Sequence, residues 1–307
     1  MGIDVLLLFL GLIGLYLGAE ALIRGGAGLT LSLGIKPILI GLTVVAFGTS
    51  LPELTVGVIS SAQGIAGLSI GNVVGSNICN ILLIFGVMAL IRPIVIEEDN
   101  LRKDIPAVLA SAALLWILAA DGAINRLDGA LLLLGFCVYI KLLWDGRKSR
   151  FAAHKSESPK SRRLLFYILI PVGLGLLIFG GWACVKGGSG IARYFAIPEY
   201  IIGLTIIAIG TSLPELAIGV LASSRGESEL PVGNALGSNI FNSLGVVGVS
   251  AMIRPFSINA DMTSFSLPAM LAASMAFLPI VTSGKRLTRL EGLGFLIAYG
   301  VYICALF

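Results

Sequence analysis

Charged residues are scarce in this chain of 307 residues, because Asp, Glu, Lys and Arg together make up only 12% of it. Hydrophobic residues make up 57%. Soluble domains contain about a quarter charged residues, so this composition excludes an ordinary soluble domain. It indicates instead a protein that lies mostly in lipid.

Histidine is nearly absent as well, since the only one, His154, lies in a polar stretch. This excludes a histidine-ligated zinc site and any catalytic triad that uses histidine as its base. The four cysteines (Cys79, Cys137, Cys184 and Cys304) lie in apolar segments and form no C-x-x-C pair. We interpret them as small packing residues, and we expect neither an enzyme nor a bound cofactor.

Long apolar runs make up most of the chain. A helix needs about 20 apolar residues to cross the hydrocarbon core of a bilayer. Ten runs of suitable length recur, at residues 4–23, 37–62, 68–91, 105–119, 127–144, 164–185, 199–224, 230–253, 265–282 and 290–306. The sequence therefore predicts an all-α membrane protein with ten transmembrane helices. The first run could be a signal peptide by its position, but residues 11–35 align with residues 173–197, so we expect a structural helix.

The two halves of the chain repeat each other at an offset of 162 residues. The segment IGLTVVAFGTSLPEL (Ile40–Leu54) returns as IGLTIIAIGTSLPEL (Ile202–Leu216). The segment GNVVGSNICN (Gly71–Asn80) returns as GNALGSNIFN (Gly233–Asn242). Near-identity over such long segments indicates two copies of one membrane module, which is typical of secondary transporters.

Five spans per copy turn the second copy upside down, because an odd number of crossings reverses its direction. The sequence thus predicts two inverted five-helix repeats, residues 1–143 and residues 164–307, joined by a linker at 144–163. Broken helices of both repeats are expected to meet at an ion site near the middle of the membrane.

The linker is the only long polar segment and is rich in Lys and Arg, which gather in cytoplasmic loops. With the linker inside, both termini lie outside, and only Arg126, Lys186, Arg193 and Arg254 of the 21 Lys and Arg residues face outward. We therefore predict a multi-pass protein of the cell membrane with extracellular termini. The linker is interpreted as a topology anchor, with regulation or binding of anionic lipid as the alternative. Nucleic-acid binding is not expected.

Two glutamates, Glu53 and Glu215, differ from the other acidic residues because each lies near the middle of an apolar run. An unpaired charge there costs at least about 2.5 kcal/mol on insertion scales, so carboxylates inside the membrane are functional by default. Pro52 and Pro214 precede the glutamates and cannot donate a backbone hydrogen bond, so each helix should break or kink beside its glutamate. Broken backbone at membrane depth is tolerated where it lines a cavity enclosed by protein.

Oxygen-bearing side chains accompany each glutamate: two lie three and four residues before it and can share its helix face, and two more share one face of the second motif at an i,i+4 spacing. They are Thr49, Ser50, Ser76 and Asn80 in the first copy and Thr211, Ser212, Ser238 and Asn242 in the second, with freed carbonyls expected near Ala46 and Ala208. A set of oxygen ligands without thiolate or imidazole suits hard cations such as Ca²⁺. Two bare carboxylates would repel each other in a low dielectric, so one ion or another must always occupy the site. Obligatory occupancy is the physical basis of exchange.

The doubled G-T-S-L-P-E and G-N-x-x-G-S-N-x-x-N motifs resemble the α-repeats of the Ca²⁺/cation antiporter superfamily. Within it, the chain is similar to prokaryotic sodium/calcium exchangers over essentially all ten spans. The resemblance implies an antiporter that exchanges Na⁺ for Ca²⁺ by alternating access, with the first and sixth helices as long gates that slide over an eight-helix core. It implies that the ions are bound by Ala46, Thr49, Ser50, Glu53, Ser76 and Asn80 and by Ala208, Thr211, Ser212, Glu215, Ser238 and Asn242.

Several alternatives stay open at this point. Proton-coupled members of the superfamily carry an acidic residue shortly after the G-N of the second motif, where this chain has Gly75 and Gly237. Some sodium-coupled archaeal members carry Asp at the position of Asn242. The two glycines disfavour proton coupling, so a Ca²⁺/H⁺ exchanger or another cation antiporter of the same fold is kept as the alternative function, and a cation channel is a weaker one. Besides Ca²⁺ and Na⁺, membrane lipids are the expected partners; the oligomeric state is open, although a monomer should suffice for transport.

Glu20 breaks the repeat, because its counterpart in the second copy is Trp182. Arg24 follows one helical turn later, so we expect an ion pair with a structural role. A role in gating or in ion access is the alternative.

Overall fold

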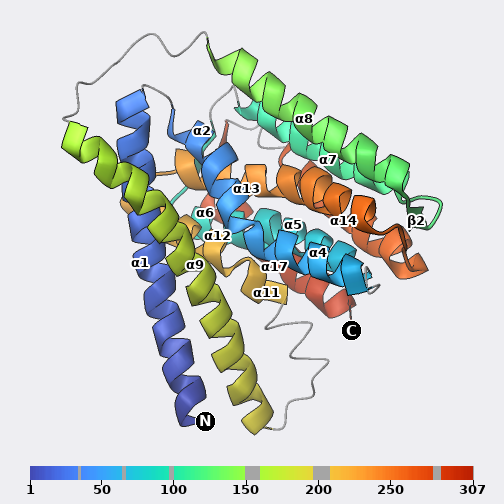
Figure 1. The fold of residues 1–307 in the computed structure, drawn as a ribbon, viewed down its shortest axis with the longest axis horizontal. Helices are drawn as coiled ribbons and strands as arrows, with labels where there is room; N and C mark the ends of the chain where they lie inside the picture. The colour runs from blue at the N-terminus through green and yellow to red at the C-terminus, as the bar shows by residue number, and fades with distance from the viewer. Residues whose placement is uncertain are drawn as a thin grey trace. The chain divides into compact units, whose positions relative to one another are not determined.

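A computed structural model describes residues 1–33, 36–63, 67–96, 100–148, 160–195, 208–278 and 285–306 (Figure 1). The chain divides into two compact units, and each draws on both halves of the sequence. Unit 1 consists of residues 1–49 with 151–234, and unit 2 consists of residues 50–150 with 235–307. The predicted division into repeats 1–143 and 164–307 concerns the sequence and stays a prediction.

Unit 1 is dominated by two long helices, α1 (Gly2–Leu33) and α9 (Lys160–Tyr194), which pack side by side along their lengths (Figure 1). The predicted length of the first and sixth helices is thereby confirmed. Its other elements are α2 (Pro37–Ile40), the π-helix η1 (Gly41–Val45), α3 (Ala46–Thr49), α11 (Ala208–Thr211), α12 (Leu213–Arg225) and the first half of α13 (Glu229–Ile240).

Glycines bring α1 and α9 into backbone contact. A Cβ atom on Gly18 would lie 2.8 Å from the carbonyl oxygen of Gly173, and one on Gly180 would lie 2.9 Å from that of Gly11. Between helices in lipid there is no hydrophobic driving force, so close packing of small residues takes its place. Around this seam Leu15, Leu22, Leu177 and Ile218 belong to one buried apolar cluster.

In its described part, unit 2 contains the remaining helices and four strands of two residues each, and the sequence did not predict these strands. The elements from the first half are α4 (Leu51–Gln63), α5 (Gly67–Ile78), η2 (Cys79–Ile84), α6 (Phe85–Ile91), β1 (Ile94–Val95), η3 (Asn100–Asp104), α7 (Ile105–Leu118), β2 (Ala123–Ile124) and α8 (Arg126–Lys148). Those from the second half are the end of α13, η5 (Phe241–Val246), α14 (Val247–Ile253), β3 (Phe256–Ser257), η6 (Met262–Ser266), α15 (Leu267–Met275), β4 (Arg286–Leu287) and α17 (Arg289–Ala305).

The strands of unit 2 join the two halves of the chain. β1 pairs with β4 in antiparallel fashion, with Ile94 opposite Leu287, and β2 pairs with β3, with Ala123 opposite Ser257. Helices are joined across the halves in the same crossed way: α6 packs on α17, and α8 packs on α14. Both helix contacts are made at glycines, since a Cβ atom on Gly86 would lie 3.0 Å from the Gly292 carbonyl and one on Gly129 would lie 3.0 Å from that of Gly248.

The bounds of the elements themselves repeat at the 162-residue offset of the sequence. Seven elements of the first half have a counterpart with the same start and end: α3 with α11, α4 with α12, α5 with α13, η2 with η5, α6 with α14, β1 with β3, and η3 with η6. The local folding rules carried by the repeated sequence therefore act alike in both halves.

Six of the ten predicted spans have the length and composition to cross a membrane within the described part of the chain. Five are continuous, at Gly2–Thr30, Ser69–Ile91, Arg126–Asp145, Leu165–Tyr194 and Glu229–Ile253, and the sixth is the bent pair Pro37–Thr49 and Leu51–Gln63. Runs 105–119 and 290–306 lie in the shorter helices α7 and α17. Runs 199–224 and 265–282 extend outside the described residues. The count of ten stays a prediction.

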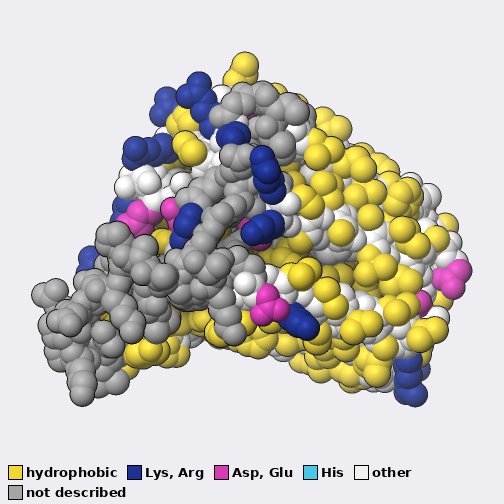
Figure 2. Space-filling model, turned by 90° about the horizontal axis from the view of Figure 1, so that it is seen from above, with side chains coloured by type: hydrophobic (Ala, Val, Ile, Leu, Met, Phe, Trp, Pro, Cys, Tyr) yellow, Lys and Arg dark blue, Asp and Glu magenta, His cyan; other side chains and the backbone are white. Residues whose placement is uncertain are grey.

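Exposed apolar side chains agree with a lipid environment. On α1, large side chains such as Ile3, Leu6, Phe9 and Leu12 are more than half exposed. Figure 2 shows hydrophobic side chains over much of the right-hand part of the visible face; most Lys and Arg side chains lie to the left of it, and a few lie among or beside the hydrophobic ones. Patches of this extent are not tolerated in water by monomeric soluble proteins.

Candidate functional site

The helix that carries Glu53 is broken directly before it, as the sequence predicts. α3 ends at Thr49 and α4 begins at Leu51, so the helix is interrupted at Ser50. Pro52 has no N–H, so the carbonyl of Gly48, one turn earlier, receives no backbone bond from it. In the second copy α11 ends at Thr211 and α12 begins at Leu213, which is the same break at the same offset.

Glu53 lies in unit 2, with its side chain only 1% exposed. The Ser76 hydroxyl on α5 donates to Glu53 Oε1 at 3.3 Å, so the structure brings these two predicted ligands together. Ser238 and Asn242 also belong to unit 2 and are buried. A carboxylate taken out of water is stable only with compensating partners.

Glu215 lies in unit 1 on α12 and is likewise buried, at 2% exposed. The first copy contributes Ala46 and Thr49 to this unit, and the second copy contributes Ala208, Thr211 and Ser212. Thr49 and Ser212 are buried, whereas Thr211 is half-buried. The meeting of Glu53 and Glu215 at one shared site stays a prediction.

Two predicted serine ligands have hydroxyls available for an ion. The Oγ atoms of Ser50 and Ser212 are buried, and neither has a hydrogen-bond partner among the described residues. Thr49 differs, because its hydroxyl lies 3.0 Å from Asn234 Oδ1 and 3.5 Å from the Ala46 carbonyl oxygen. A donated proton leaves the lone pairs of the Thr49 oxygen free to face a cation.

Asn80 and Asn242 each begin a turn of π-helix, which the sequence interpretation did not foresee. They are the second residues of η2 and η5, and their carbonyls accept from Phe85 N and Val247 N, five residues on. The widened turn runs onward from each asparagine, after the α-helix that carries the serine of the same motif. Single turns of this kind occur frequently at functional sites.

In unit 2 the side-chain amide nitrogens of Asn80 and Asn242 donate hydrogen bonds, whereas their amide oxygens accept none from the described residues. Asn80 Nδ2 donates to Asn239 Oδ1 at 3.1 Å, and Asn242 Nδ2 donates to Asn77 Oδ1 at 3.2 Å. Asn80 Oδ1 and Asn242 Oδ1 are buried without a hydrogen-bond partner in the described part of the chain. Buried polar atoms are almost always satisfied, so two equivalent orphaned oxygens indicate that something else binds them. Neutral oxygens beside a carboxylate fit a hard cation.

Sequence reasoning missed three asparagines that contact these ligands, Asn77, Asn239 and Asn234, and Ser243, which contacts Asn77. All four are buried. The sequence did contain a sign of the first two, since an asparagine three residues before each ligand is repeated within an apolar helix. Of the motif glycines, Gly233 lies in close helix contact, because a Cβ atom there would lie 2.5 Å from the Ile38 carbonyl oxygen, whereas no described heavy atom lies within 4 Å of one on Gly75.

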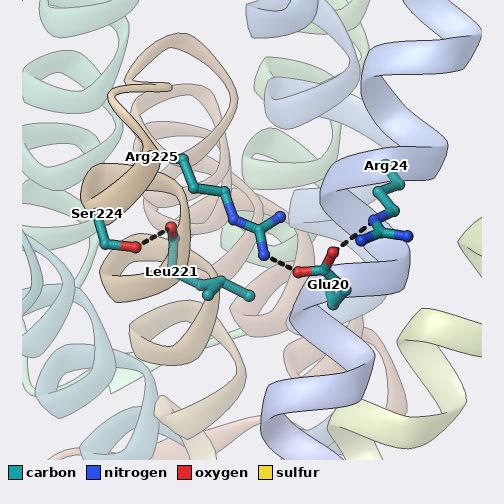
Figure 3. A network of polar contacts seen from close by, with 5 residues as sticks. All are labelled: Glu20, Arg24, Leu221, Ser224 and Arg225. Atoms are coloured by element: carbon teal, nitrogen blue, oxygen red, sulfur yellow. Dashed lines mark hydrogen bonds and ion pairs between the residues drawn. The ribbon is translucent and has the colours of Figure 1, made fainter.

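The predicted Glu20–Arg24 pair is confirmed, with 2.5 Å between Arg24 Nε and Glu20 Oε1. Arg225, at the end of α12, contacts the other carboxylate oxygen, so Glu20 forms ion pairs with two guanidinium groups on two helices (Figure 3). The Glu20 side chain is 14% exposed and Arg225 is 33% exposed. The cluster ties α1 to the helix that carries Glu215.

Helices suited to a membrane, a broken helix beside a buried carboxylate and orphaned amide oxygens define a membrane protein that handles cations. A family model described as "Sodium/calcium exchanger protein" matches residues 3–144 and 165–307. The chain belongs to this family and is a membrane transport protein.

Individual relatives cover nearly the whole chain. The sodium/calcium exchanger MaX1 of Methanosarcina acetivorans is 30% identical, with 99% of each protein covered. The inner membrane protein YrbG of Escherichia coli is 37% identical, over 88% of this chain and 86% of YrbG. Among solved structures, the sodium-calcium exchanger NCX_Mj soaked with 10 mM Na⁺ and zero Ca²⁺ matches with a TM-score of 0.88 at 30% identity, covering 99% of both chains.

Proposed function

We propose that this protein exchanges Na⁺ for Ca²⁺ across the cell membrane, by alternating access to one site that Glu53 and Glu215 share. The observation that carries the proposal is the pair of buried, orphaned oxygens on Asn80 and Asn242, at equivalent positions of both copies. The break before each glutamate supports it, because broken helices in transporters supply backbone carbonyls to coordinating ions. The proposed ligands are the twelve residues predicted from the sequence.

Charge balance gives the exchange its electrical character. One Ca²⁺ neutralises two ionised glutamates, whereas three Na⁺ would leave the site with one positive charge. A cycle of that kind moves net charge across the membrane and responds to voltage. Asn80 and Asn242 cannot take up or release a proton in the working pH range, so coupling rests on Na⁺ competing for the glutamates and hydroxyls.

The proposed topology has ten spans in two inverted repeats, with both termini outside and residues 144–163 inside. The strand pairs support the alternation of crossings. In this topology β1 and β4 both lie on the cytoplasmic side and β2 and β3 both lie outside, and these are the strands that pair. The cluster of Glu20, Arg24 and Arg225 also falls on one side, the cytoplasmic one.

The function is tested by uptake of radioactive Ca²⁺ into proteoliposomes that contain the purified protein. Na⁺, K⁺ or a pH gradient is supplied as the only counter-ion gradient. Uptake should require outwardly directed Na⁺ and should fall at acid pH, because protons neutralise Glu53 and Glu215. Equal uptake driven by a pH gradient without Na⁺ would show a Ca²⁺/H⁺ exchanger, and uptake that needs no counter-ion would show a channel.

The topology is tested with single cysteines placed in the linker and, as the matched outer site, at Arg126. An impermeant thiol reagent applied to intact cells should label the outer position alone. Labelling of the linker would overturn the orientation.

A further inference from the structure

An amide side chain binds a cation only when its oxygen, and not its nitrogen, faces the ion. The two ends of an asparagine amide have nearly the same shape, so its orientation is decided by the hydrogen-bond partners around it. For Asn80 and Asn242 those partners are Asn239 and Asn77, on the opposite copy of the motif but within unit 2.

The orientation of Asn77 is fixed first. Its Nδ2 lies 3.3 Å from the backbone carbonyl oxygen of Asn239, 2.8 Å from Ser243 Oγ and 3.5 Å from the sulfur of Met270. A backbone carbonyl can only accept, so the NH₂ end of Asn77 must face it. Asn77 Oδ1 then faces Asn242, which must present its own NH₂ group. The oxygen of Asn242 is thereby the atom left over.

We propose that Asn77 and Asn239 are positioning residues of the ion site, each holding a ligand asparagine so that the amide oxygen faces the cation. The inference rests on the proposed function, in which Asn80 and Asn242 are ligands. A reversed amide would direct two partly positive hydrogens at the ion, so loss of the positioning residue should weaken binding without removing any ligand atom.

The two copies are not equally fixed. Ser243, which accepts from Asn77, has Ile81 as its counterpart at the 162-residue offset. Asn239 Nδ2 is buried with no hydrogen-bond partner among the described residues. The orientation of Asn242 is thus fixed by its hydrogen bond to Asn77 and by the bonds that hold Asn77 itself. The orientation of Asn80 is fixed by its hydrogen bond to Asn239 alone. Asn77 should accordingly be the more important of the two positioning residues.

The test compares Asn77→Ala in two backgrounds. In the natural background it should raise the KM for Ca²⁺ about tenfold, since hydrogen bonds that orient a ligand of an ion contribute as charge-assisted bonds do. In an Asn242→Asp background it should change KM less than about twofold, because a carboxylate presents an oxygen whichever way it is turned. The mirrored pair, Asn239→Ala with and without Asn80→Asp, should show the same pattern with a smaller change.

A matched pair of serine variants, Ser243→Ala and Ser250→Ala, tests a smaller change in the KM for Ca²⁺. Both remove a buried hydroxyl that makes a hydrogen bond, but Ser250 bonds Ser69 instead of Asn77. Ser243→Ala should raise KM about threefold, and Ser250→Ala should leave it unchanged. If Asn77→Ala raised KM equally in both backgrounds, or left it unchanged in the natural one, the positioning role would be wrong.

Thermal unfolding in detergent separates this role from a purely structural one and from the proposed function. A positioning residue, when lost, reduces the rise in Tm produced by added Ca²⁺ more than it lowers the Tm without ions. A lower ion-free Tm with an unchanged rise would mean a structural role only. If the unsubstituted protein showed a Ca²⁺-dependent rise but no Na⁺-driven uptake, the exchange proposal would fail while the positioning test would still stand.

Discussion

The two predicted ligand asparagines occupy the same point of the same backbone, one residue into η2 in the first copy and one residue into η5 in the second. Their supports differ. Ser243 fixes the second-copy ligand through Asn77, where the first copy has Ile81. Glu20 ties α1 to Arg225, where the counterpart on α9 is Trp182. The ligand asparagines and the asparagines that hold them follow the repeat, whereas Ser243 and Glu20 do not.

This difference has a physical meaning for alternating access. Two identical inverted copies would give inward-facing and outward-facing states of equal energy. Under the proposed alternating access, unequal supports would bias that equilibrium without changing what binds. The symmetric ligands and the asymmetric supports can therefore be tested separately.

The largest effect should come from the symmetric part. Glu53→Gln and Glu215→Gln each remove one of two formal charges that face a divalent ion, so Ca²⁺ exchange should fall by about 100-fold or more in both variants. Uptake into proteoliposomes measures this, with Glu227→Gln, at an exposed position, as the control. If either buried variant exchanged Ca²⁺ at the natural rate, the shared site would be disproved.

A smaller effect should come from the α1–α9 seam. Gly18→Ala places a methyl group 2.8 Å from Leu177 N and from the Gly173 carbonyl, so the helices must separate. The Tm should fall by several degrees, because overpacking costs about 1–3 kcal/mol. Gly175→Ala on α9 is the matched control, since no described heavy atom lies within 4 Å of its added Cβ. Equal effects of the two substitutions would contradict close contact at Gly18.

The smallest effect should come from the asymmetric tie at Glu20. Glu20→Gln and Arg225→Gln should each change the maximal exchange rate roughly threefold, as partly exposed ion pairs contribute little, and should leave the KM for Ca²⁺ unaltered. The double variant should resemble Glu20→Gln alone, because that substitution already removes the ion pair with Arg225. Independent, additive effects would show that the two residues act through different partners.

Much of the site could be predicted because it depends on residue type and spacing. The break at Pro52 follows from a missing N–H, and the burial of Glu53 follows from its apolar surroundings in the sequence. Asn77 was missed because its role depends on a partner in the other half of the chain. The strands were missed because two residues leave no periodic pattern, and the π-turns because no simple residue preference marks them.

Early and late parts of the chain pair with each other, so unit 2 cannot be fully assembled until the late parts have been synthesised. β1 is complete when the ribosome has made Val95, but its partner β4 comes only at Arg286. At about 5–20 residues per second the first half waits roughly ten seconds or longer in the membrane. During that time the glycine face of α6 lacks α17, which later packs Gly292 against Gly86. Among the described elements of unit 2, α17 is thus the last to be synthesised. A chain that ends before it would leave the helix faces that α17 covers exposed, and the quality control of the cell could recognise them.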